Sequence, residues 1–223
     1  WAQPQGSKLY EALIRFHGDT SLSADKIHQI GLRDTQRITA LIDRELLALN
    51  QTEGSVAERL REMLEAPEYM FDDSDIGRAK MLRIIKKNID EIQAKLPLWF
   101  QGLEKTPITI ARVPTYRQDG APSAYYNEPT GSALGTFWVN QGNLQALPTF
   151  LLKTLSYHEA VPGHHLQAVA GLNSPTLPRL RRVAPYNAYD EGWALYAEGL
   201  AFEMGAYTND SLGNVGRLEE EIL

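Results

Sequence analysis

The spacing of apolar residues in the first hundred positions constrains the fold most, because it repeats with the period of an α-helix. Ser23 and Ser74 each precede such a repeat, and Ser55 opens a capping box, so all three predict helix starts. We expect a short helix after Ser23, a second after Gly31, a third that ends before Pro67 and a fourth after Ser74. The repeat is carried by Ile38, Leu41, Ile42, Leu46 and Leu49 in the second helix and by Leu82, Ile85, Ile89, Ile92 and Leu96 in the fourth.

Residues 106–147 have a different pattern, in which Pro and Gly separate short runs that favour β-structure. Helical spacing returns after Pro148, which suits the first position of a helix, and a further helix is expected from about Asp190 to Met204. The fold class that follows is mainly α with a small β-sheet element. The expected strands lie at residues 108–113, 124–126 and 136–140.

Composition excludes several kinds of function. The 223 residues include no cysteine, so disulfides and thiolate metal sites are excluded, and a transition metal would need His and carboxylate ligands. The net charge of −6 is spread along the chain, which argues against nucleic-acid binding, because that function needs clustered Lys and Arg. No apolar run approaches the ~18–20 residues of a membrane span. The periplasm and the cytoplasm both stay open as compartments, and the oligomeric state is unknown.

A cluster of histidines and one glutamate marks the candidate site, at residues 158–165 with the sequence HEAVPGHH. A His-Glu pair near the end of a helix opens the zinc-hydrolase signature. In that signature a second His one turn later also binds the metal, and the Glu acts as general base. Here the residue four positions after His158 is Pro162, so the plain form of the signature is absent.

Helix geometry bears on whether His164 or His165 joins His158. On a straight helix His165 returns near the face of His158 but about 10 Å further along the axis, too far for two ligands of one zinc. Pro162 removes an amide donor and clashes with the preceding turn, and Gly163 frees the backbone, so we expect a widened turn. That turn favours His164 as the ligand and leaves His165 to support the site or contact substrate. If the helix simply ends here, His164 must reach the metal from a loop.

A catalytic zinc also needs a third protein ligand and an open position. Glu191 and Glu198 lie two helical turns apart on one face of the helix downstream, so both can face the same site. One would bind zinc, and the other would orient a histidine from behind. The alternative for Glu191 is an acid in the first turn of its helix, where the helix dipole favours it.

Two motifs resemble those of the DUF885 family: HExxPGHHLQ at residues 158–167 and YNAYxEGWALYAE at residues 186–198. The resemblance extends over the whole chain. Family members are bacterial proteins regarded as zinc peptidases of the gluzincin type, in which two His and one Glu hold the metal. The resemblance therefore implies a gluzincin-like core with one zinc ion per chain, bound by His158, His164 and Glu191.

The resemblance also bears on the extent of the chain, because family members are longer. The sequence starts at Trp1 and stops at Leu223 inside an expected helix, so we expect a fragment of one catalytic domain. Its expected parts are a helical scaffold at 1–105, the β element and loops at 106–147, and the metal-site helices at 148–223.

The expected activity is zinc-dependent peptide hydrolysis. Zinc would activate a water molecule and polarise the scissile carbonyl, and Glu159 would pass a proton from that water to the leaving amine. The strand at 136–140, with Asn140, is the candidate edge strand for an extended substrate. The candidate oxyanion donors are Tyr126, Tyr186, Tyr189 and Tyr196, of which Tyr126 and Tyr196 are retained as catalytic candidates.

Other interpretations stay open. The same residues would serve a zinc hydrolase of non-peptide amides or esters, and only substrate profiling separates the two. A catalytically silent helical domain that binds peptides, or a purely structural helical module, would carry the histidines at a helix end without a metal. The expected partner is a peptide or a small amide, and Mn or Co is an alternative to zinc.

Overall fold

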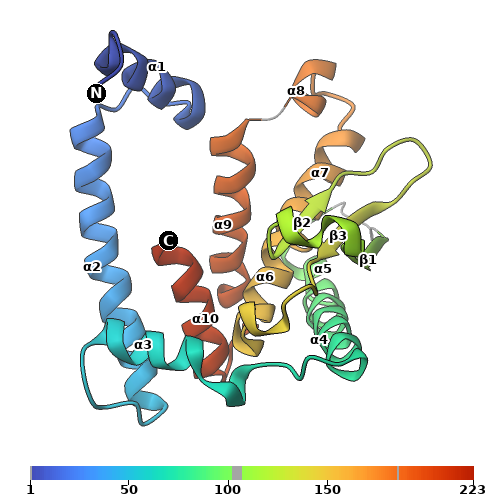
Figure 1. The fold of residues 1–223 in the computed structure, drawn as a ribbon. Coiled ribbons are helices and arrows are strands. Elements are labelled where there is room, and N and C mark those ends of the chain that lie inside the picture. The colour runs from blue at the N-terminus through green and yellow to red at the C-terminus, as the bar shows by residue number, and fades with distance from the viewer. Residues whose placement is uncertain (1, 102–106, 185) are drawn as a thin grey trace.

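The computed structural model describes residues 2–101, 107–184 and 186–223, and its architecture is mainly helical with one small sheet (Figure 1). The three predicted caps each open a helix, and the Ser74 side chain accepts a hydrogen bond from the amide of Gly77. Ser23 accepts a hydrogen bond from the amide of Lys26, and Ser55 and Glu58 form the reciprocal capping box. The N-terminal elements are α1 (Gly6–Gly18), α2 (Ala24–Ala48), α3 (Val56–Glu65), the 3₁₀ turn η1 (Pro67–Tyr69), α4 (Asp75–Gln93) and α5 (Leu96–Trp99).

Helix α2 corrects one expectation, because the two helices predicted on either side of Gly31 are a single helix of 25 residues. No heavy atom lies within 4 Å of the position that a Cβ at Gly31 would take, so no close contact requires a glycine there. A glycine inside a helix costs about 1 kcal/mol, which packing of the apolar face offsets. Ile38, Ile42 and Leu46 are the buried residues of that face.

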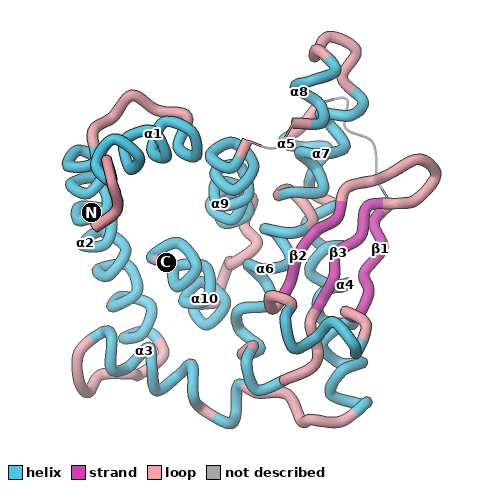
Figure 2. Tube along the Cα trace, turned by 45° about the horizontal axis from the view of Figure 1, so that its top comes forward, coloured by secondary structure: helices cyan, strands magenta, loops and turns pink. Residues whose placement is uncertain are grey.

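The three predicted strands are confirmed and form one sheet in the order β1-β3-β2 (Figure 2). β1 pairs in parallel with β3, with Ile110 opposite Phe137, and β2 pairs antiparallel with β3, with Tyr126 opposite the same residue. The elements of this part are β1 (Ile108–Arg112), the 3₁₀ turn η2 (Thr115–Gly120), β2 (Ala124–Asn127), β3 (Gly135–Val139) and the 3₁₀ turn η3 (Leu144–Ala146).

The position of β3 overturns its predicted role as an edge strand. It is the central strand, so its backbone hydrogen-bonds to neighbours on both sides and cannot receive a further chain. The strand that faces the metal-site helices is β2, which packs against α6 (Leu152–Glu159) and pairs with β3 only, among the described residues. The local pattern of a strand does not show which distant strand will pair with it.

The last part of the chain contains the helices that carry the candidate site. Pro148 caps the 3₁₀ turn η4 (Thr149–Leu151), which runs directly into α6. The helix expected from Asp190 starts three residues earlier and ends one residue before Met204. The elements that follow α6 are α7 (His164–Asn173), α8 (Arg179–Val183), α9 (Asn187–Glu203) and α10 (Ser211–Ile222).

Helix α6 lies at the centre of the molecule and packs against α4, α9 and α10 (Figure 1). Its residues Leu152 and Tyr157 are buried, as are Ile85 of α4 and Leu218 of α10, and all four belong to one continuous apolar core. Complete burial of one such side chain contributes about 1.5–3 kcal/mol. The segment that ends in His158 and Glu159 is therefore held rigidly. None of the described helices is both long and apolar enough to cross a bilayer.

Candidate metal centre

The histidine cluster lies where one helix stops and the next begins. α6 ends at Glu159 and α7 begins at His164, so the helix is interrupted and not simply stretched. Two hydrogen bonds cross the interruption, from the amide of Gly163 to the carbonyl of Tyr157 (2.9 Å) and from the amide of Leu166 to the carbonyl of Ala160 (3.3 Å). Each spans six residues in place of the usual four. The turn is therefore widened, as the sequence predicted.

Three residues define the shape of this turn. Pro162 has no amide to continue the helix, and its own carbonyl accepts a hydrogen bond of 2.9 Å from the indole of Trp193 on α9. A Cβ at Gly163 would lie 1.9 Å from the carbonyl oxygen of His158, so a larger residue cannot take this position without moving the backbone. The turn is thus tied to α9 and requires glycine at its end.

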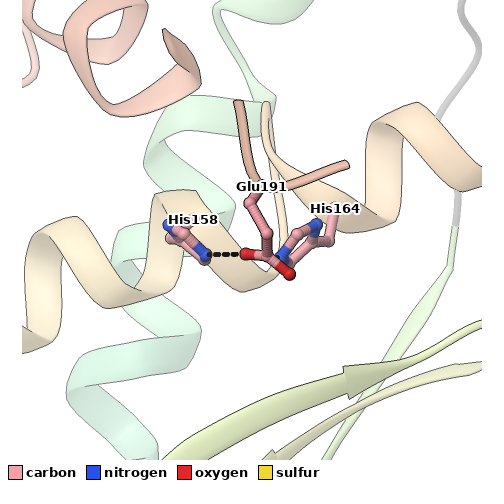
Figure 3. A group of neighbouring side chains, drawn as sticks. All are labelled: His158, His164 and Glu191. Atoms are coloured by element: carbon pink, nitrogen blue, oxygen red, sulfur yellow. Dashed lines mark ion pairs between the residues drawn. The ribbon is translucent and has the colours of Figure 1, made fainter. Parts of the chain in front are cut away.

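His158, His164 and Glu191 converge from α6, α7 and α9 (Figure 3). Glu191 Oε2 lies 3.7 Å from Nε2 of His158 and 3.6 Å from Nε2 of His164. One potential ligand atom from each residue lies within 4.8 Å of the other two. The Glu191 side chain is 68% exposed, which leaves one side of the cluster open. The structure thus brings together the three residues that the sequence nominated as ligands.

Behind this cluster, a buried carboxylate orients the first histidine. Glu198 Oε1 lies 2.8 Å from Nδ1 of His158, and the hydroxyl of Thr154 donates to its other oxygen. Because a carboxylate only accepts, the proton of the neutral His158 ring lies on Nδ1, which leaves the Nε2 lone pair facing Glu191. Glu198 therefore occupies the orienting position that the sequence left open between two acids.

The groups around the two histidines shift their pKa values in opposite directions. Burial opposes the charged form of His158, but the hydrogen bond to Glu198 and the nearby carboxylates outweigh it and raise the pKa of His158. Burial and the neighbouring His158 lower the pKa of His164. In the absence of a cation, therefore, His158 carries the positive charge of the pair more readily.

Glu159 is the last residue of α6 and is only 7% exposed, although it lines the cleft beside the cluster. Burial raises the pKa of Glu159 to about 7, against the opposing effect of His158. A carboxylate with a pKa near neutrality can both take up and release a proton at physiological pH.

His165 faces the sheet and not the cluster. Its ring is fully buried, and its Nδ1 lies 2.8 Å from the hydroxyl of Tyr126 on β2. A Cβ at Gly135 of β3 would lie 2.2 Å from that hydroxyl, so glycine leaves room for the pair. His165 thus supports Tyr126, which itself lines the cleft.

Of the other residues that the sequence nominated, some line the cleft and some lie outside it. Tyr186 and Tyr189 line the same cleft as the cluster. Tyr196 is 56% exposed, its ring is tilted by 50° against that of Trp193, and it does not line this cleft. Asn140 also lies outside it, where its amide binds two loop carbonyls and its oxygen accepts from a loop amide.

A cleft of about 630 Å³ contains the cluster and is bordered by β2, α6, α7, α8 and the start of α9. Volumes of this order are typical of small-molecule and short-peptide sites.

The profile of a protein family, described as bacterial protein of unknown function (DUF885), matches residues 1–223. The chain belongs to the DUF885 family. No match was found among curated proteins.

Two solved structures resemble this DUF885 chain. One, described as a "putative lipoprotein" from Colwellia psychrerythraea, is 45% identical over the whole chain, with a TM-score of 0.95. The other comes from Shewanella oneidensis, carries the same description with unknown function, and is 21% identical over 96% of the chain, with a TM-score of 0.68. At that identity the second shows a shared fold alone. This DUF885 chain spans 38% and 40% of the lengths of those proteins.

Sequence reasoning missed residues of the DUF885 site that act through another side chain. Thr154 precedes His158 by one helical turn, a spacing that could have nominated it as a partner of the same acid. Trp193 braces the turn through Pro162, and Gly135 makes room for Tyr126. The local sequence around Trp193 and Gly135 does not indicate these roles, because each contact joins segments that are distant in the chain.

Proposed function

We propose that this chain carries the metal-binding and catalytic core of a zinc-dependent peptidase. One observation carries the proposal: two imidazoles and one carboxylate converge from three separate helices, and a buried glutamate adjoins them. Such a group of side chains is the ligand set of gluzincin-type hydrolases. A surface helix end would not need a buried carboxylate behind its histidine.

The donor set fits zinc in kind and in spacing. Ligand atoms about 2.0–2.1 Å from a tetrahedral zinc lie about 3.4 Å from one another. The two His–Glu distances of 3.7 and 3.6 Å are close to that value. The absence of cysteine leaves His and carboxylate as the only strong ligands for a transition metal. His158, His164 and Glu191 would hold the ion.

A zinc ion bound there supplies Lewis-acid chemistry, which makes a water molecule more acidic and a carbonyl more electrophilic. Glu198 contributes by fixing the proton of His158 on Nδ1, so that Nε2 stays available as a ligand. The exposed side of Glu191 leaves room for substrate to approach.

Glu159 is assigned the proton transfers. Its carboxylate accepts a proton from the attacking water and delivers it to the nitrogen of the leaving amine. A group whose pKa lies near 7 is suited to both steps. Tyr126 is assigned the second task, donation of a hydrogen bond to the oxygen of the scissile carbonyl as negative charge develops there. When His165 donates to the Tyr126 oxygen, the phenol proton is free to point into the cleft.

A peptide is favoured over other amides by the strand that borders the cleft. Ala124, Tyr125 and Tyr126 of β2 line it, and β2 pairs with β3 only, among the described residues. The outer edge of β2 can therefore pair with the backbone of an extended substrate. This assignment replaces β3, which has no open edge.

The decisive experiment combines metal analysis with one substitution. Zinc is measured in purified protein prepared without added metal, and hydrolysis of a mixed peptide library is followed by mass spectrometry. We expect one zinc per chain and peptide cleavage that Glu159→Gln lowers by at least a hundredfold, with zinc content unchanged. Zinc well below one per chain, together with no effect of Glu159→Gln, would leave the metal-free peptide-binding domain as the better interpretation. Cleavage of esters or non-peptide amides alone would select the other hydrolase class.

A further inference from the structure

The cleft extends beyond the predicted metal ligands and reaches two arginines that the proposed reaction does not use. Arg181 and Arg182 of α8 line the same cleft as His158 and His164. Figure 1 shows α7 leading from the end of α6 to α8. The two ends of the cleft are therefore connected along one helix.

One face of α7 lines the cleft. His164, Gln167 and Gly171 all line the cleft and follow one another at helical spacing. The seven residues from His164 to Gly171 correspond to about 10 Å along the helix axis. An extended peptide covers about 3.3–3.6 Å per residue, so this face of α7 is as long as roughly three residues of an extended substrate.

Both arginines are held in place without an acidic partner. The Nε of Arg182 donates to the carbonyl of Leu177 (2.8 Å), which orients its guanidinium and leaves the two terminal amino groups available. The guanidinium of Arg181 lies 5.2 Å from the ring centre of Tyr186, which also lines the cleft. Within residues 2–101, 107–184 and 186–223, neither arginine forms an ion pair.

Besides Glu159 and Glu191, the acids Glu128 and Asp190 line the cleft, and Asp190 is engaged in other contacts. Asp190 accepts hydrogen bonds from the amide of Tyr186 (2.9 Å) and from the side chain of Gln167 (3.3 Å). In a chain of net charge −6, two arginines that line a cleft and form no ion pair within the described residues can bind an anion.

We propose that Arg181 and Arg182 bind a carboxylate of the substrate in the part of the cleft that α8 borders. This inference rests on the proposed peptidase function, and it names the substrate class as short peptides with an anionic end or side chain. The carboxylate can be a free C-terminus or an Asp or Glu side chain, because both offer the same planar group to a guanidinium. Since Arg181 is exposed, the interaction is screened by salt.

Binding to an inactive protein tests the site without relying on turnover. The probes are N-terminally fluorescent penta-alanine with a free carboxylate, its C-terminal amide, and the amide with one Asp placed at each position in turn. Affinity is measured by fluorescence anisotropy on the Glu159→Gln protein. We expect the free acid to bind about tenfold more tightly than the amide at low salt, with the difference shrinking as NaCl is added.

Matched variants locate the effect. The double variant Arg181→Gln/Arg182→Gln should abolish the preference for the acid and leave the affinity for the amide unchanged. Arg179→Gln is the control, because this arginine belongs to the same helix and does not line the cleft. An Asp-containing amide that matches the free acid assigns the site to acidic side chains, and one that stays as weak as the plain amide assigns it to the C-terminus. Equal binding of acid and amide, no binding of any probe, or a preference that survives the double variant overturns the proposal.

The failure of this proposal and that of the peptidase function can be told apart. If the acid preference depends on the arginines but zinc-loaded protein cleaves no peptide, the anion site stands and the peptidase function fails. If peptides are cleaved with equal kcat/KM as acid and amide, by parent and double variant alike, the peptidase function stands and the anion site fails.

Discussion

Nδ1 of His158 lies 2.8 Å from Oε1 of Glu198, and this contact links the candidate metal site to the buried core of the molecule. The Glu198 side chain is only 3% exposed and also accepts a hydrogen bond from Thr154, and His158 is its ion-pair partner within the described residues. A substitution of Glu198 can therefore test the candidate metal site without changing any of the three candidate ligands.

Replacing Glu198 with Gln should weaken zinc binding by about 10- to 100-fold, because the amide keeps a hydrogen-bond acceptor but removes the negative charge that makes His158 a better ligand. The measurement is competition for zinc against a chromophoric chelator. Glu203→Gln is the control, since Glu203 is an exposed acid at the end of the same helix. Zinc affinity equal to that of the parent would mean that His158 does not bind the metal through Nε2.

Replacing Gly163 with Ala should disrupt the turn between α6 and α7, because the added Cβ would lie 1.9 Å from the carbonyl oxygen of His158. We expect a loss of roughly 2–4 kcal/mol in unfolding free energy together with weaker zinc binding. Urea denaturation followed by circular dichroism measures the first effect. Gly31→Ala is the matched control, and it should stabilise the protein by about 0.5–1 kcal/mol, since it adds a methyl group in open space inside α2. Similar stabilities for the two variants would contradict the described turn.

Much of the fold could be predicted from the sequence because its signals are local. The caps at Ser23 and Ser55 depend on residues within one helical turn, and each strand was visible in its own composition. The candidate metal ligands could be predicted for a related reason. His158 and His164 belong to one short motif, and the widened turn follows from the chemistry of Pro162 and Gly163.

The rest depends on contacts between distant segments, which local patterns do not encode. The central place of β3 arises from its parallel pairing with β1, and His165 reaches Tyr126 across 39 positions of the chain. The continuity of α2 through Gly31 was missed for a different reason. The glycine predicts a break in the helix, but packing of the apolar face of α2 outweighs the local cost of that residue.

Replacing Tyr126 with Phe should lower kcat for peptide cleavage by about 10²–10³-fold with zinc content unchanged, if this phenol donates to the developing oxyanion. Tyr196→Phe is the informative comparison, because Tyr196 was an equal candidate in the sequence but does not line the cleft. Steady-state kinetics of both variants on the same peptide provide the measurement. A large loss for Tyr196→Phe and none for Tyr126→Phe would reverse the assignment.

Glu220 on α10 should make the metal-free protein less stable as the pH rises. Burial, with the charges of Glu198 and Glu219, raises the pKa of Glu220 in the folded chain from 4.5 to about 7. Folding thus favours the neutral carboxyl, so this contribution to stability is complete below pH 4.5 and is lost as the pH rises through about 7. Glu220→Gln stays neutral at every pH. It should therefore gain stability relative to the parent between pH 5 and pH 8, by roughly 1–2 kcal/mol after allowance for solvent screening.

The measurement for Glu220 is urea denaturation of chelator-treated protein at a series of pH values, with the exposed Glu65→Gln on α3 as control. The control should follow the parent across the whole range, because Glu65 lies at the surface of α3. A constant difference between the parent and Glu220→Gln would show that the Glu220 carboxyl has the same proton affinity in the folded and unfolded chains.

A bound cation should change this pH dependence. The carboxyls near the two histidines raise one another's pKa, and a positive charge close to them favours their ionised forms. Saturating zinc should therefore reduce the pH-dependent difference, since its charge lowers the pKa of every carboxyl near the site.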